Sequence, residues 1–221
     1  MQTKIWATRM QYFSKEGQDR FAHILIGNKG TFLDLGCNHP YAGNNTAALE
    51  QLGWSGIVVD YQPRWVSLNQ KARSAQVLQS DTASPNFITD LIEIAPDLAF
   101  DYISVDVDEA SIETLRLLID SDVTFKCMTF EHSLFEDPNQ KNFSKSILSE
   151  KGYTILFEDV LCDLSHDGYM CAQPFEDWWI DPTAFPESLL EIKGSSMLHN
   201  NIIEKLVAWR TSLHRRSVFD E

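Results

Sequence analysis

Carboxylates and glycines near the start of the chain lie where two apolar runs end. Asp34 lies in the first run, with Gly36 and Asn38 just after it, and Asp60 ends the second run. A glycine lets the backbone approach a ligand without a Cβ in the way, and an acid at the end of a second strand can accept hydrogen bonds from both ribose hydroxyls. These four residues predict a site for a nucleoside-containing cofactor at the carboxyl ends of two neighbouring strands.

Three further polar residues lie where two later apolar runs end. Asp106 belongs to one run, and Glu131 and His132 follow the other. Together they offer ligands for a hard divalent ion such as Mg²⁺, which would lower the pKa of a bound hydroxyl and position it. Without a metal, His132 would be a general base, because an ordinary imidazole pKa of about 6.5 suits proton abstraction near neutral pH. A structural histidine is the third interpretation.

Two more pairs of residues have a functional and a structural interpretation each. Gln18 and Asp19 precede the first strand and could close a pocket, or they could form a solvated helix face. Trp178 and Trp179 could stack on the apolar face of a sugar ring, or they could pack against the sheet.

Alternating strand and helix patterns must position these residues. Apolar runs predict seven strands, at residues 31–35, 56–60, 76–79, 102–107, 125–130, 153–157 and 169–172. Helical spacing predicts helices at residues 5–27, 44–52, 66–73, 86–94, 112–119, 143–151 and 195–213. This alternation predicts an α/β fold with a mostly parallel seven-stranded sheet and helices on both faces. The short connection before the last strand predicts that this strand is antiparallel.

One domain is the expectation for 221 residues of which 43% are hydrophobic. Its expected parts are an N-terminal helical segment (1–30) that packs on the cofactor side, a sheet region (31–175) and an aromatic segment with a helix (176–221). That last helix carries one apolar face, formed by Ile202, Ile203, Leu206 and Trp209. The face would cap the domain or pair with a second copy in a homodimer.

Charge and composition exclude several partners. The formal net charge is −14 and the pI is about 4.7, so nucleic acid and anionic membranes would be repelled by most of the surface. Four cysteines without a Cys-x-x-Cys pair indicate a reducing compartment and no structural zinc. No stretch has the apolar length of a signal peptide or a membrane span. We therefore expect a soluble, cytoplasmic protein.

Several motifs occur in an order and spacing that resemble the FkbM-type family of S-adenosylmethionine-dependent methyltransferases. They extend from about residue 16 to 180 and are Glu16-Gly-Gln-Asp-Arg-Phe21, Phe32-Leu-Asp-Leu-Gly-Cys-Asn38, Asn45-Thr46, Leu52-Gly-Trp-Ser-Gly-Ile-Val-Val-Asp60, Phe100-Asp-Tyr-Ile-Ser-Val-Asp-Val-Asp108 and Phe130-Glu-His132. The resemblance implies a Rossmann-like class I methyltransferase fold. It also implies O-methylation of a hydroxyl on a sugar, glycan or small metabolite.

The resemblance also implies roles for individual residues. Cofactor contacts would come from Asp34, Gly36 and Asn38 around the methionine part, from Asp60 at the ribose, and from Asp81 and Asp106. Asp81 would lie against the adenine amine, although an acid at this position could equally cap the following helix. Asp106, Glu131 and His132 would form the catalytic end of the pocket.

Two other functions stay open. A nicotinamide-dependent oxidoreductase would use the same ribose-binding acid, but a diphosphate needs Gly-x-Gly-x-x-Gly running directly into a helix, and here Pro40 separates Gly36 from Gly43. Asp108 and Glu109 stand where many family members have an acid and a glycine. This difference leaves open a relative that binds the cofactor without catalysis, and both acids could instead cap the next helix.

Overall fold

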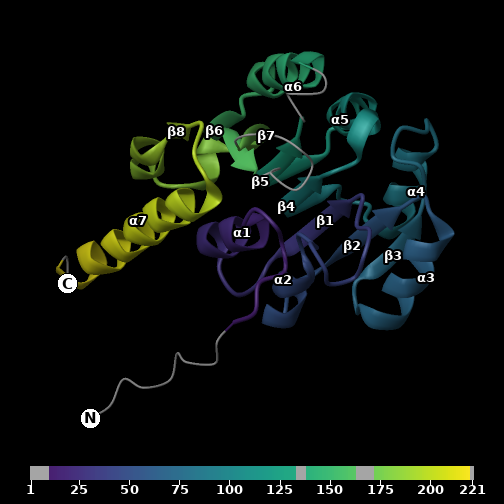
Figure 1. Ribbon diagram of the computed structural model, residues 1–221, viewed down its shortest axis with the longest axis horizontal. Coiled ribbons are helices and arrows are strands. Elements are labelled where there is room, and N and C mark those ends of the chain that lie inside the picture. The colour runs from purple at the N-terminus through teal and green to yellow at the C-terminus, as the bar shows by residue number, and fades with distance from the viewer. Residues whose placement is uncertain (1–9, 133–137, 163–171, 220–221) are drawn as a thin grey trace, which may run out of the picture.

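A central sheet with helices on both faces forms the molecule (Figure 1). The computed structural model describes residues 10–132, 138–162 and 172–219. The strands are β1 (Thr31–Leu35), β2 (Ser55–Asp60), β3 (Gln76–Gln79), β4 (Ala99–Val105), β5 (Thr124–Glu131), β6 (Thr154–Cys162), β7 (Gln173–Ile180) and β8 (Gly194–Ser195). The α-helices are α1 (Gln18–Ile26), α2 (Ala47–Leu52), α3 (Pro63–Ala72), α4 (Phe87–Ile94), α5 (Ser111–Asp120), α6 (Pro138–Glu150) and α7 (His199–Phe219). Short 3₁₀ helices are η1 (Asp108–Ala110), η3 (Pro182–Ala184) and η4 (Glu187–Ile192).

The strand order is β3-β2-β1-β4-β5-β7-β6-β8, and β3 through β5 in this order are parallel. β7 runs antiparallel to both β5 and β6, while β8 pairs in parallel with β6. The predicted mostly parallel α/β fold with an antiparallel strand is therefore confirmed. The sheet of the described residues has eight strands instead of seven, because β8 has only two residues and leaves no periodic signal.

The position of the antiparallel strand differs from the prediction. We expected it at residues 169–172, of which 169–171 lie outside the described residues, and it is found at Gln173–Ile180. From residue 176 on, every residue of β7 is buried, so the strand lacks the alternation that marks a half-buried one. β7 consequently extends past residue 175, the expected end of the sheet region, and β8 adds residues 194–195 to the same sheet.

Consecutive side chains of a strand point to opposite faces of the sheet, and each face has its own hydrophobic core. One core joins α1, α2 and α7 through residues such as Phe21, Leu49 and Ile203, and the other joins α4, α5 and α6. Trp178 packs in the first core, 4.6 Å from the ring of Phe21, and Trp179 packs in the second. Both tryptophans are fully buried. Of the two interpretations, packing is therefore confirmed and stacking on a sugar is wrong, because neither ring is accessible to a ligand.

The two terminal helices lie side by side over the first core. Ile202, Ile203, Leu206 and Trp209 of α7 are at most 5% exposed, so this apolar face caps its own chain and is not available to a second copy. The N-terminal helix begins at residue 18, later than predicted, because Gly17 adopts a left-handed conformation with φ +82° and Ser14 forms a β-bridge with Gly43. Residues 5–9 of the predicted helix lie outside the described part. None of the described helices has the length and apolarity to cross a membrane.

Candidate active site

A cavity of about 530 Å³ opens at the carboxyl ends of the parallel strands. Seven of the predicted site residues line it: Asp34, Gly36, Asn38, Asp60, Asp81, Asp106 and Glu131. The N-terminal segment contributes Lys15, Glu16 and Gln18 to the same cavity. The structure thus brings together strand-end residues that are up to 97 positions apart with a segment that precedes the sheet.

The loop after β1 is held between the ends of its neighbouring strands. The amides of Gly36 and Cys37 both donate to the carbonyl of Val59, at 3.0 Å, and the amide of Asp106 donates to the carbonyl of Leu35 at 3.1 Å. Gly36 has φ +81°, and a Cβ there would overlap the carbonyl oxygen of Asp106. Only glycine fits this position without displacing the end of β4.

Asp60 lines the cavity and keeps acceptor capacity. Its Oδ2 accepts the Asn38 amide at 3.0 Å and its Oδ1 accepts the Gln62 amide at 2.8 Å. A carboxylate offers about four lone-pair sites, so each oxygen can accept one more hydrogen bond. The two backbone bonds fix the carboxylate, which prepares it to accept a pair of ribose hydroxyls.

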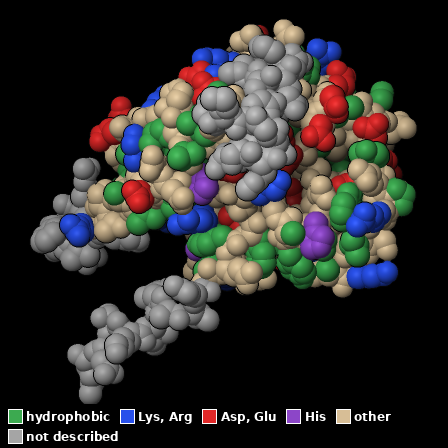
Figure 2. All heavy atoms as spheres, viewed as in Figure 1, with side chains coloured by type: hydrophobic (Ala, Val, Ile, Leu, Met, Phe, Trp, Pro, Cys, Tyr) green, Lys and Arg blue, Asp and Glu red, His purple; other side chains and the backbone are tan. Residues whose placement is uncertain are grey.

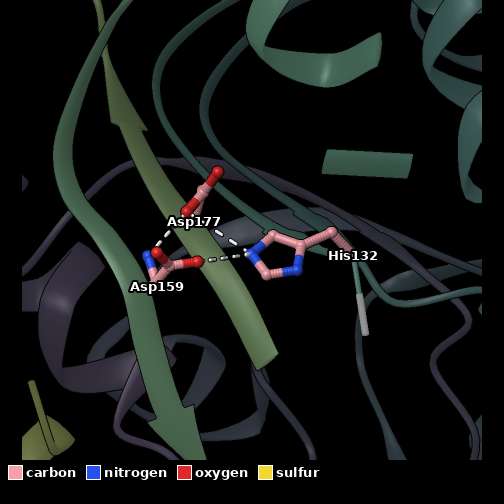
Figure 3. Close-up of side chains that lie close together, drawn as sticks. All are labelled: His132, Asp159 and Asp177. Carbon is pink, nitrogen blue, oxygen red and sulfur yellow. Dashed lines mark hydrogen bonds and ion pairs between the residues drawn. The ribbon is translucent and has the colours of Figure 1, made fainter. Parts of the chain in front are cut away.

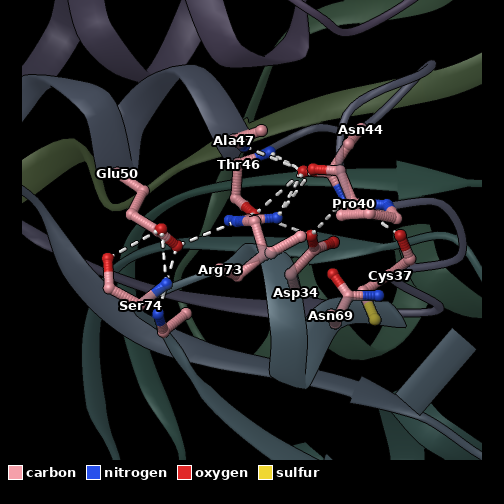
Figure 4. A network of polar contacts seen from close by, with 12 residues as sticks. Asp34, Cys37, Pro40, Asn44, Thr46, Ala47, Glu50, Asn69, Arg73 and Ser74 are labelled. Carbon is pink, nitrogen blue, oxygen red and sulfur yellow. Dashed lines mark hydrogen bonds and ion pairs between the residues drawn. The ribbon is translucent and has the colours of Figure 1, made fainter. Parts of the chain in front are cut away.

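Asp34 lines the cavity and also belongs to a buried polar network (Figure 4). It accepts hydrogen bonds from Thr46 Oγ1 at 2.7 Å and from Asn44 Nδ2 at 3.4 Å. Burial raises the pKa of Asp34 to about 6, although the Thr46 hydrogen bond and the charge of Arg73 act in the opposite direction. Arg73 donates to Thr46 and Asn44, both at 3.0 Å, and forms an ion pair with Glu50 at 2.9 Å. Asp34 therefore ties the loop after β1 to the start of α2, and Arg73, which the sequence did not single out, completes this support.

Asp81 stabilises a turn before α4 and is not the N-cap residue of that helix, which is Asn86. Its Oδ1 accepts the Ala83 amide at 3.0 Å, and the residue is exposed and lines the cavity. Contact with an adenine amine stays a prediction. The residue before α5 is Ala110, which makes no side-chain cap hydrogen bond, and Asp108 and Glu109 of η1 line the cavity.

Gln18 and Asp19 have different positions although they are adjacent. Gln18 lines the cavity, as the pocket-closing interpretation predicts. Asp19 is fully buried and accepts hydrogen bonds from the amides of Phe13 at 2.7 Å and Ser14 at 3.2 Å. Asp19 therefore holds the N-terminal segment together and does not face the cavity.

Two further acids belong to this region, and the sequence analysis gave neither of them a role: Glu16 lines the cavity, and Glu176 lies opposite Glu131, which lines it. Glu16 accepts the Cys162 thiol at 3.0 Å and contacts His199 Nδ1 at 2.9 Å. Glu176 of β7 pairs directly with Glu131 of β5, so both side chains lie on the same face of the sheet. Burial raises the pKa of Glu176 to about 8, and the charges of Asp106 and Glu16 add to the effect.

His132 does not belong to the cavity. Because it follows Glu131 directly, its side chain points to the opposite face. It is fully buried, and its Nε2 lies 3.4 Å from Asp177 Oδ1 and 3.9 Å from Asp159 Oδ1 (Figure 3). The predicted metal set of Asp106, Glu131 and His132 therefore does not converge, and the prediction of His132 as general base in the pocket is wrong. Asp106 and Glu131 remain at the cavity wall.

Comparison with known proteins finds similarity in fold and none in sequence family. No protein-family model matches the sequence, and no curated protein matches it. Among solved structures, the chain is similar to a proposed rRNA methylase from Clostridium thermocellum, with a TM-score of 0.51 and 12% identity over 77% of this chain and 97% of that one. It is also similar to an S-adenosylmethionine-dependent methyltransferase from Methanosarcina mazei, with a TM-score of 0.50 and 13% identity over 72% and 96%. The chain thus has the Rossmann-like fold of these methyltransferases.

Proposed function

We propose that the protein transfers a methyl group from S-adenosylmethionine to a hydroxyl of a sugar, glycan or other small metabolite, as the FkbM-type resemblance implies. The observation that carries the proposal is the cavity at the ends of β1 and β2, lined by the fixed carboxylate of Asp60. The fold similarity supports the same class of cofactor.

The start of α2 favours S-adenosylmethionine over a dinucleotide. A dinucleotide places its pyrophosphate at the free amides of a helix N-terminus. Here Asn44 Oδ1 already accepts the amides of Thr46 at 3.0 Å and Ala47 at 2.8 Å. The helix also begins only at residue 47, after an eleven-residue loop that contains Pro40. The site thus suits a ribose with one carboxylate partner and offers no cradle for two phosphates.

Carboxylates at the acceptor end can orient and deprotonate the hydroxyl. When bound, S-adenosylmethionine supplies an electrophilic methyl group on a sulfonium. Asp106 and Glu131 line the cavity, and either can accept the hydrogen bond and then the proton of an acceptor hydroxyl. Alignment of the acceptor oxygen with the methyl carbon contributes most of the rate enhancement in such a reaction, so these residues need only position a reactive oxygen.

The charge of the cavity disfavours a phosphate-rich acceptor. Its described lining contains one lysine, Lys15, and eight acids: Glu16, Asp34, Asp60, Asp81, Asp106, Asp108, Glu109 and Glu131. Carboxylates around a partly closed cavity focus a negative potential there, which repels phosphate groups. We therefore expect a neutral or cationic acceptor.

Isothermal titration calorimetry tests the cofactor assignment. We expect S-adenosylhomocysteine to bind and NAD⁺ to bind much more weakly. Asp60→Ala should weaken S-adenosylhomocysteine binding by about 100-fold, because two charge-assisted hydrogen bonds together contribute about 3 kcal/mol. Asp97→Ala is the matched control, since Asp97 is an exposed acid that precedes β4 and lies outside the cavity lining. Equal or tighter binding of NAD⁺ would contradict the proposal.

A further inference from the structure

His132, Asp159 and Asp177 form a cluster on the face of the sheet opposite the cavity. His132 follows β5, Asp159 lies in β6 and Asp177 lies in β7. Asp177 pairs with Phe130 across the β5–β7 ladder, and Phe130 packs in the core under α5 and α6. The cluster therefore joins three adjacent strands and is separated from the cavity by the sheet itself.

The spacing of the three side chains fits a small metal ion. One ligand atom from each residue lies within 4.8 Å of the other two (Figure 3). His132 Nε2 is 3.4 Å from Asp177 Oδ1 and 3.9 Å from Asp159 Oδ1. Nitrogen and oxygen ligands about 2.0–2.2 Å from a tetrahedral Zn²⁺ lie about 3.3–3.6 Å apart. Binding would thus require only small side-chain shifts.

Burial makes the cluster costly without a cation. His132 and Asp177 are fully buried, and the Asp159 side chain is 16% exposed. Asp177 Oδ1 accepts the Asp159 amide at 2.8 Å, whereas Asp177 Oδ2 has no hydrogen-bond partner among the described residues. Figure 3 shows that Oδ2 points away from His132 and Asp159, so Oδ1 is the ligand atom that faces the cluster. A buried carboxylate with few hydrogen bonds is costly to keep charged, and a cation beside Oδ1 would stabilise its charge.

The neighbouring lysines leave a charge deficit. Lys141 lies 2.5 Å from Asp159 and 3.1 Å from Glu158, with only 12% of its side chain exposed. Lys145 pairs with Glu158 at 2.8 Å, so the charge of Glu158 is balanced without Lys141. Asp159 and Asp177 then carry two negative charges against the one positive charge of Lys141. One negative charge remains, and a cation bound between the two carboxylates would neutralise it.

We propose that His132, Asp159 and Asp177 bind a Zn²⁺ ion that clamps β5, β6 and β7 together. One imidazole and two carboxylates are ligands that Zn²⁺ accepts, and Mg²⁺ would prefer an all-oxygen octahedron. Lys141 keeps its ion pair with Glu158 when Zn²⁺ takes over the Asp159 carboxylate. The site stabilises the strand ends that carry Glu131 and Glu176 on the other face, and it takes no part in methyl transfer.

Metal titration of the EDTA-treated full chain tests the site. We expect Zn²⁺ to bind with a stoichiometry of one in calorimetry and to raise the melting temperature by about 5–10 °C at 100-fold excess over its dissociation constant. MgCl₂ should produce a much smaller shift. His132→Gln and Asp177→Asn should remove the heat of binding and the thermal shift.

His199→Gln is the matched control, because His199 also contacts a carboxylate, that of Glu16, but lies outside the cluster. It should bind Zn²⁺ as the wild type does. If Asp177→Asn does not fold by circular dichroism, Asp159→Asn replaces it, since that residue is less buried. The proposal is overturned if Zn²⁺ gives neither heat nor thermal shift, or if the cluster variants bind it as tightly as the wild type. Either result leaves S-adenosylhomocysteine binding untouched as a separate test of the cavity.

Discussion

Carboxylates at the strand ends differ in their hydrogen bonds and in the direction in which burial shifts their pKa. Asp60 is fixed by two backbone amides at the cavity wall. Burial raises the pKa of Asp34 to about 6 and that of Glu176 to about 8, and Glu176 has a second acid, Glu131, directly opposite. Near neutral pH, Glu176 is therefore largely protonated, which removes one negative charge from beside Glu131.

Glu176→Gln should change how stability depends on pH. The folded state holds the Glu176 proton up to a pKa of about 8, above the ordinary value of 4.5. The contribution of this group is therefore full below about pH 4.5 and is lost as the pH rises through 8. We expect the wild type to lose about 2–4 kcal/mol between pH 5 and 9 from this group, and glutamine to remove that loss. Urea unfolding at pH 5, 7 and 9 measures it.

The comparison for this experiment is Glu187→Gln, at an exposed position. Its stability should follow the wild-type curve at every pH. Parallel curves for wild type and Glu176→Gln would show that the Glu176 carboxyl is not perturbed by burial.

Sequence predicts a site residue well where its role follows from a short local pattern. Asp34, Gly36 and Asp60 were found because a strand, a glycine turn and a second acidic strand end form one continuous motif. Glu176 and Arg73 were missed because each acts through contacts with segments more than 25 residues away, Arg73 with Asn44 and Thr46 among them. The alternation of side chains along a strand could have shown that His132 and Glu131 do not share a site, because neighbouring strand residues point to opposite faces.

The elements that were predicted are those whose residue types are typical of their structure. The parallel strands β1 to β5 and the helices between them agree with the predicted order. β7 was displaced in the prediction because it contains Pro174, Glu176 and Asp177, which are residue types that are rare in strands. The two-residue β8 offers no pattern at all.

The buried face of α7 should contribute more to stability than its exposed face. Leu206 is fully buried against the first core, whereas Val207, the next residue, is 48% exposed. Leu206→Ala should lower the free energy of unfolding by about 2–5 kcal/mol through lost burial and a cavity. Val207→Ala should change it by less than about 0.5 kcal/mol. Urea denaturation monitored by circular dichroism compares the two, and equal effects would contradict the capping role of α7.

In the whole molecule, the central sheet separates two polar sites, the cavity and the cluster of His132, Asp159 and Asp177. The cavity lies on the side of α1 and α2, and the histidine cluster lies on the side of α5 and α6. This division follows from the alternation of side chains along β5 and β7, which sends Glu131 and Glu176 to one face and His132 and Asp177 to the other. Most of the charged side chains that line the cavity are acidic.

Because the whole molecule is acidic, we expect that it does not bind RNA. The chain has 32 acids against 18 lysines and arginines, and Figure 2 shows acidic side chains gathered near α5 on one face. Nonspecific binding of nucleic acid depends on lysine and arginine that displace counterions from the phosphates, and its dissociation constants are about 10⁻⁴–10⁻⁶ M at physiological salt.

A fluorescent 20-nucleotide RNA hairpin should therefore show no anisotropy change with up to about 100 μM protein at 150 mM salt. Lowering the salt should not produce binding, because a net charge of −14 strengthens repulsion as screening weakens. Micromolar binding that weakens steeply with added salt would instead indicate a basic surface for nucleic acid and would favour an RNA acceptor over a hydroxyl of a small metabolite.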